Sequence, residues 1–137
     1  EEDVVRSLDV VLYFPEASSQ QLLARQKTLT LYEGESAMGV LMEALQAGPE
    51  EDGLLPLLPD GFHVLTVRLA EDGVCHLNLP AADLELLPEG ESAQLRMFRG
   101  IVRSLCSLDE VTSVQVLVDG EMRTSFGTVD ISQPLRP

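Results

Sequence analysis

Two histidines and two cysteines are the side chains best suited to covalent or acid–base chemistry: His63, His76, Cys75 and Cys106. A nucleophilic cysteine or serine needs a base such as histidine within hydrogen-bonding reach. Cys75 and His76 are adjacent in a segment that alternates like a strand, so their side chains point to opposite faces. The adjacent Cys–His pair is therefore excluded as a catalytic dyad.

The histidines are interpreted as ordinary residues. His76 shares an outward face with Val74 and Asn78, whereas a catalytic base needs a partner that orients it. A deep cleft that holds His63 or His76 beside an acid would favour a hydrolase instead, and the sequence leaves this alternative open.

The cysteines are expected to be buried free thiols, because free cysteine commonly behaves as a small hydrophobic residue. Cys75 shares its face with Leu77 and Leu79, and Cys106 follows Leu105. The alternative is a disulfide that ties a helix to the sheet, which an oxidising compartment would allow. Two cysteines and two histidines without motif spacing do not make a zinc site. We expect no metal and no cofactor.

Carboxylates are abundant, and some stand side by side, as in Glu50–Asp52 and Asp109–Glu110. A glycosidase needs two carboxylates that face each other across a cleft. Neighbours in sequence do not establish that geometry, and 23 acidic residues make such neighbours inevitable. We predict no catalytic residues and a protein that is not an enzyme.

The net charge of −14 comes from 9 basic and 23 acidic residues spread along the chain. A field of this sign repels nucleic acid and anionic lipid surfaces. Nucleic acid is therefore argued against as a partner, and the acidic surface is interpreted as one that favours solubility. A cationic partner or scattered calcium sites are the alternatives.

The length of 137 residues suits one domain over 1–137, with its core in about 8–135. Because aromatic residues make up 4% and Trp is absent, the core must be mostly Leu, Val and Ala. The chain opens at Glu1 without a leader, as a trimmed mature segment would. No run of about 18 apolar residues is present, so we expect contact with a membrane only through an upstream anchor outside this chain.

Alternation predicts a strand over Leu8–Phe14, ended by Pro15, then a polar loop over Glu16–Gln21 and a short strand over Lys27–Tyr32. A helix follows, with Ser36 as its candidate N-cap and Gly48-Pro49 as its stop. Its apolar stripe is formed by Val40, Leu41, Ala44 and Leu45.

Four leucines stand in the loop 50–61: Leu54, Leu55, Leu57 and Leu58. Leucines in a loop either cap the end of a sheet or form a surface for a partner. Both interpretations remain open in the sequence.

The second half begins with the clearest hairpin of the chain, in which Phe62–Leu69 and Val74–Leu79 flank the turn 70–73 with its Asp-Gly pair. A strongly apolar face predicts a helix over Glu91–Leu108. The strand Val111–Val118 is apolar on both sides and is expected to be central in the sheet. A short edge strand is predicted over Thr128–Ile131.

These elements follow a β-α-β-β-α-β order, which predicts an α+β fold with two helices packed on one face of a mixed or antiparallel sheet. Several segments appear in a recognisable order along the chain. They are LYFP (12–15), EALQAGP (43–49), LPDG (58–61), DGVCHLNL (72–79), and the closing VLVDGE (116–121) with VDISQPL (129–135).

In this order the segments resemble the GerMN domain of bacterial sporulation and spore-germination lipoproteins. Proteins of this family are thought in some cases to carry two copies, whereas this chain has one. The hairpin arm of the family usually has small or β-branched residues where this chain has Cys75 and His76.

The resemblance implies an extracytoplasmic protein, either a membrane-anchored lipoprotein or secreted, and a fold similar to the ring-building modules of secretion systems. It supplies no catalytic residues. We expect a non-enzymatic envelope module that acts by contact with protein partners or by self-association, against which the charge of −14 counts. The expected surface comprises Leu54, Leu55, Leu57, Leu58, Thr128 and Ile131. The alternative is a sensory domain that binds a cell-wall fragment or small molecule.

Overall fold

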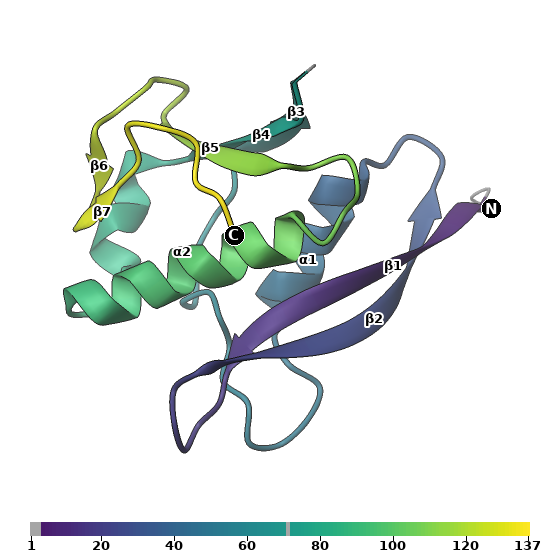
Figure 1. The fold of residues 1–137 in the computed structure, drawn as a ribbon, viewed down its shortest axis with the longest axis horizontal. Coiled ribbons are helices and arrows are strands. Elements are labelled where there is room, and N and C mark those ends of the chain that lie inside the picture. Colours follow the sequence, from purple (N-terminus) through teal and green to yellow (C-terminus); the bar gives the residue numbers. More distant parts are fainter. Residues whose placement is uncertain (1–3, 71) are drawn as a thin grey trace.

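The structure, a computed structural model, describes residues 4–70 and 72–137 (Figure 1). The opening residues 1–3 and Glu71 of the predicted hairpin turn lie outside the described residues. Ten elements follow each other: β1 (Val4–Pro15), β2 (Leu22–Tyr32), α1 (Ala37–Ala47), β3 (Thr66–Leu69), β4 (Val74–Leu79), a 3-10 helix (Ala81–Leu86), α2 (Glu91–Leu105), β5 (Ser113–Val118), β6 (Ser125–Phe126) and β7 (Val129–Asp130).

β1 and β2 form a long antiparallel hairpin of their own. The predicted alternation holds, because Leu8, Val10, Leu12 and Phe14 are all buried. The predicted second strand was too short. Pro15 pairs with Leu22 directly across the turn, so β2 follows β1 in register along nearly its whole length.

The second ladder has the order β3-β4-β5, with β3 antiparallel and β5 parallel to β4. The predicted hairpin is confirmed as β3 and β4. The middle strand of the three is β4, whereas the sequence predicted that β5 would be central. β5 is nevertheless covered on both faces. Val114, Val116 and Val118 are buried in the core, while the opposite-facing Gln115 amide donates to the carbonyl oxygen of Ile131 at 2.8 Å.

The signals that bound α1 behave as predicted. The Ser36 hydroxyl accepts a hydrogen bond from the N–H of Gly39 at 3.0 Å, which satisfies one of the free donors at the start of the helix. Gly48 ends the helix with a φ of 88°, and its N–H donates to Leu45 O. A positive φ is accessible to glycine at little cost.

α2 lies between the β1–β2 hairpin and the second ladder (Figure 1). Ser104 of α2 and Ser107, two residues beyond the end of the helix, complete the hairpin. The N–H groups of Val11 and Tyr13, which point away from β2, donate at 3.1 Å to the hydroxyls of Ser107 and Ser104 respectively. This arrangement satisfies donors that an edge strand would otherwise leave open.

The C-terminal segment packs against α2 and β5. Phe126 of β6 packs edge-on against Phe98 of α2, with ring centroids 5.9 Å apart, and Leu135 exchanges two backbone hydrogen bonds with Val114. The predicted final strand is present as β7, although it is shorter. The α+β class and the order of the main elements are confirmed.

Candidate functional site

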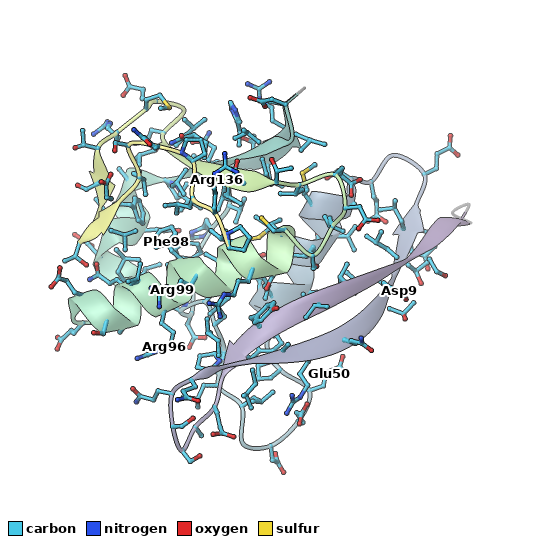
Figure 2. All side chains as sticks on the ribbon, in the orientation of Figure 1. Asp9, Glu50, Arg96, Phe98, Arg99 and Arg136 are labelled. Atoms are coloured by element: carbon cyan, nitrogen blue, oxygen red, sulfur yellow. The ribbon has the colours of Figure 1, made fainter. Side chains whose placement is uncertain are left out.

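A groove of about 510 Å³ lies between the β1–β2 turn and the outward face of α2. We call it the arginine groove. It is defined by Gln20 and Gln21 from the turn and by Arg96, Arg99 and Arg103 from α2. Figure 2 labels two of its residues, Arg96 and Arg99.

Helical spacing brings the three arginines together. Positions i, i+3 and i+7 share one face of a helix, and on the opposite face Met97, Phe98 and Ile101 are buried. The apolar face fixes the rotation of α2, so the arginines must face outward. Arg99 and Arg103 are exposed and Arg96 is half-buried.

The groove carries positive charge, and its arginines form no ion pair within the described residues. Among the described side chains the Arg and Lys ion pairs are Arg25–Glu51, Lys27–Glu50 and Arg123–Glu121, so none of the groove arginines has an acidic partner. Like charges three and four residues apart on a helix destabilise it slightly. A cluster of this kind stands out on a chain whose net charge is −14.

The turn that forms one wall of the groove contains several hydrogen bonds of its own. The Gln20 N–H donates to the carbonyl oxygen of Glu16 at 2.7 Å, and the Glu16 N–H donates to the carbonyl oxygen of Gln21 at 2.8 Å. Gln20 has a φ of 61°. The Glu16 carboxylate accepts hydrogen bonds from Ser19 and Ser18 at 2.7 and 3.1 Å, and these lower its pKa. The carboxylate is thereby engaged within the turn.

A smaller apolar pocket of about 150 Å³ adjoins the arginine groove. We call it the proline pocket. It is defined by Pro15, Leu55, Pro56 and Pro88, and it shares Gln20 and Arg96 with the arginine groove. The two hollows are therefore parts of one surface, cationic at one end and apolar at the other.

The structure corrects part of the surface predicted from sequence. Leu57 and Leu58 are each 6% exposed, and Ile131 is fully buried. Leu57 lies against Gly100 of α2, where an added Cβ would stand 2.5 Å from its Cδ1 atom. These three side chains belong to the core, and of them Leu57 also lines the proline pocket.

The other predicted surface residues are accessible but do not form one patch. Leu55 is 41% exposed and lines the proline pocket, and Leu54 is half-buried. Thr128 is exposed at the β6–β7 turn, where its N–H and hydroxyl both donate to Gln94 Oε1. The role of these residues in an interface stays a prediction.

The arginines were missed by the sequence analysis, although their spacing was visible. Arg96, Arg99 and Arg103 lie opposite the apolar face of the predicted helix. The turn residues that complete the groove are more than 70 positions away from them in the chain, and no local pattern connects the two.

One histidine does stand beside an acid. His63 Nδ1 lies 3.2 Å from Asp83 Oδ1, and the His63 N–H donates to Asp83 Oδ2 at 2.6 Å. The His63 side chain is 69% exposed, and no hydroxyl or thiol in the described part of the chain hydrogen-bonds to its ring. Asp83 is buried and fastens the 3-10 helix to the segment that leads into β3.

The two cysteines are free thiols. Burial raises the pKa of Cys75 to about 12, with a further contribution from the nearby Cys106. Burial also raises the pKa of Cys106, and the charge of Arg136 opposes that rise. Since the thiolate is the nucleophilic form of cysteine, both groups are poorly reactive at neutral pH.

No cluster of three or more metal-ligating side chains occurs in residues 4–70 and 72–137. Over the same ranges no helix combines the length and the apolar character needed to cross a membrane.

The fold and its surface define a small α+β domain with an open cationic groove. The family model Germane, described as sporulation and spore germination, matches residues 11–124. The chain belongs to this family, and the resemblance to GerMN domains found in the sequence is confirmed.

Solved structures show the same fold. The first GerMN domain of the sporulation protein GerM from Bacillus subtilis is 20% identical, with a TM-score of 0.74 over 94% of this chain and 97% of that chain. A putative lipoprotein from Clostridium perfringens is 25% identical, with a TM-score of 0.64 over 98% and 90% of the two chains. The tandem GerMN domains of GerM are 17% identical, with a TM-score of 0.70, and the match covers 98% of this chain and 47% of theirs. No curated protein matched the chain.

Proposed function

We propose that this domain is a non-enzymatic module of the bacterial cell envelope, located outside the cytoplasm, that acts in sporulation or germination by contact with another protein. The description of its family supports the process. The similar structures, a putative lipoprotein and the sporulation protein GerM, support the location.

The observation that carries the proposal is the composite surface of arginine groove and proline pocket. Protein interfaces combine an apolar anchor with a polar rim, and arginine is among the residues that contribute most to their binding energy. Here three arginines without acidic partners among the described side chains lie beside an apolar pocket. Leu55, which lines this pocket, is itself partly exposed.

Site-specific photocrosslinking in the native host tests this proposal. A photoreactive amino acid replaces Leu55 or Leu95, which line the two hollows, and, as the control, Leu84, which has the same 41% exposure as both. We expect one discrete protein adduct at Leu55 and Leu95 and none at Leu84. The absence of adducts at Leu55 and Leu95, or equal adducts at all three positions, would contradict the proposal.

Charge favours a partner other than a second copy of the chain. Two molecules of net charge −14 repel each other most strongly at low ionic strength, where screening is weak. We expect light scattering after size exclusion to give a monomer mass at low and at high salt. A mass that rises with protein concentration and with salt would instead assign the contact to self-association.

A second candidate function is the recognition of a cell-wall fragment or small molecule. The arginine groove, at about 510 Å³, has the size typical of ligand sites, about 300–1,000 Å³. Guanidinium groups suit ligands that carry carboxylates. A fragment that binds the folded domain raises its unfolding midpoint, so a thermal shift with peptidoglycan fragments that is lost in Arg99→Gln would favour this candidate.

A further inference from the structure

We propose that the arginine groove and the proline pocket together bind an extended acidic segment of a partner protein. Carboxylates of the segment contact Arg96, Arg99 and Arg103, and an apolar side chain enters the proline pocket. This inference rests on the proposed function, contact with another protein, and specifies the chemistry of the segment that is bound.

The charge of the groove determines the sign of the ligand. Three guanidinium groups face one hollow without an acidic partner in the described part of the chain. Arginine binds carboxylates through two parallel hydrogen bonds, which gives both strength and orientation. A negatively charged segment would also relieve the repulsion among the arginines.

The spacing of the arginines fits an extended backbone. Along α2 the rise from Arg99 to Arg103 is about 6 Å and from Arg96 to Arg103 about 10 Å. Side chains on one face of an extended segment repeat every 6.6 Å or so, so acidic residues at alternate positions match the Arg99–Arg103 step.

Polar groups for the backbone of the segment are present on the opposite wall. Gln20 and Gln21 are exposed, and their side-chain amides form no hydrogen bond with any described residue. Each amide can both donate and accept. These two residues can therefore pair with peptide groups of the segment while the arginines hold its carboxylates.

The apolar end of the surface favours a protein segment over a phosphate polymer. Either ligand could pair its negative charges with the arginines, but a phosphate polymer has no apolar group to place in the proline pocket. That pocket adjoins the groove at the shared residues Arg96 and Gln20. Leu55 in that pocket and Leu95 in the groove are each 41% exposed. An apolar side chain next to the acidic residues would cover this surface.

Selection from a random decapeptide display library, followed by fluorescence anisotropy on an enriched peptide, tests the proposal on the whole chain. We expect enriched peptides to carry two or more acidic residues at alternate positions and one adjoining apolar residue. Arg99→Glu is expected to weaken binding about tenfold or more, since each charged hydrogen bond contributes substantially. Arg68→Glu, which changes charge equally on the exposed face of β3, is expected to leave affinity unchanged.

The pocket has its own matched pair. Leu55→Ser is expected to weaken binding of the apolar-plus-acidic peptide several-fold but not of the same peptide with its apolar residue replaced by serine. Leu84→Ser, at equal exposure of 41%, is the control. Circular dichroism and the unfolding midpoint establish that each variant is folded.

Three results would overturn the inference. They are enrichment without acidic residues, equal binding by wild type and Arg99→Glu, and tight binding of inorganic polyphosphate with no effect of Leu55→Ser on the enriched peptides. Crosslinks at Leu55 and Leu95 together with any of these results would retain the protein-contact function and reject the acidic segment alone. Absent crosslinks would reject the function itself.

Discussion

Leu57 shows how one residue can resemble surface in the sequence and belong to the core in the structure. It stands in a loop, yet it is 6% exposed and lies against Gly100, whose missing side chain leaves room for it. We predict that Leu57→Ala lowers the free energy of unfolding by about 2–4 kcal/mol, because it leaves a cavity.

The matched control for Leu57 is Leu55→Ala in the same loop, at a side chain 41% exposed. Its effect is expected to stay within about 1 kcal/mol, because surface substitutions have small effects. Urea unfolding measures both variants. Equal losses at the two positions would show that Leu57 is not a core residue.

Cys75 provides a second prediction at the scale of one residue. Its thiol has a pKa of about 12 in the folded state, against 9.0 ordinarily. Between these values the unfolded chain releases the Cys75 proton and the folded chain retains it. The free energy of unfolding therefore falls as pH rises, by about 1.4 kcal/mol per pH unit from this group.

Alkylation tests the burial that raises the pKa of Cys75. In the native protein at pH 8, iodoacetamide is expected to label Cys106, which is half-buried, before Cys75, which is fully buried. Cys75 is expected to react only when the chain unfolds, and Cys106→Ser isolates its rate. Rapid labelling of Cys75 in folded protein would contradict the burial.

Between elements, Ser104 of α2 and Ser107, two residues beyond the end of that helix, do what a neighbouring strand would otherwise do for β1. Ser104 is fully buried, and its hydroxyl accepts from the Tyr13 N–H. We predict that Ser104→Ala lowers the free energy of unfolding by about 1–3 kcal/mol, because the partly buried Tyr13 N–H loses its acceptor. Ser92→Ala, at an exposed position of the same helix, is the control, and chemical denaturation compares them. A loss no larger than that of Ser92→Ala would mean that water replaces the hydroxyl.

The elements predicted correctly are those whose signals are local. Alternation located β1 and β4, and the Ser36 cap and Gly48 stop bounded α1. β2 was predicted too short because its first half, from Leu22, gains its pairing from β1 rather than from its own pattern. The central strand is set by the pairing of β4 with β5, two strands that α2 separates in the chain. The residue types in these strands do not reveal that pairing.

The same distinction explains the candidate site. Helical spacing in the sequence is enough to place the three arginines on one face of α2. That this face meets the β1–β2 turn follows from the docking of α2 against β1. The groove is therefore a tertiary feature, and only its cationic wall could have been anticipated.

For the whole molecule, the net charge of −14 sets the response to salt. Excess charge of one sign destabilises the compact state by self-repulsion, and salt screens it. We predict that the unfolding midpoint rises by several degrees between low and physiological ionic strength. A nonionic solute at equal osmolality is the control in calorimetry. A midpoint that falls with sodium chloride would show that attractive ion pairs outweigh the repulsion.

The hydrogen bonds from β1 to the two serines have a consequence for amide hydrogen exchange. Because the amides of Val11 and Tyr13 donate to Ser107, just after α2, and to Ser104 of α2, any separation of this end of the helix from the hairpin exposes these two hydrogens while the β1–β2 ladder stays paired. Their exchange with deuterium therefore reports the local opening of the wall behind the groove, separately from global unfolding. A ligand that spans the groove would slow these two amides and leave the amides that pair β1 with β2 unchanged.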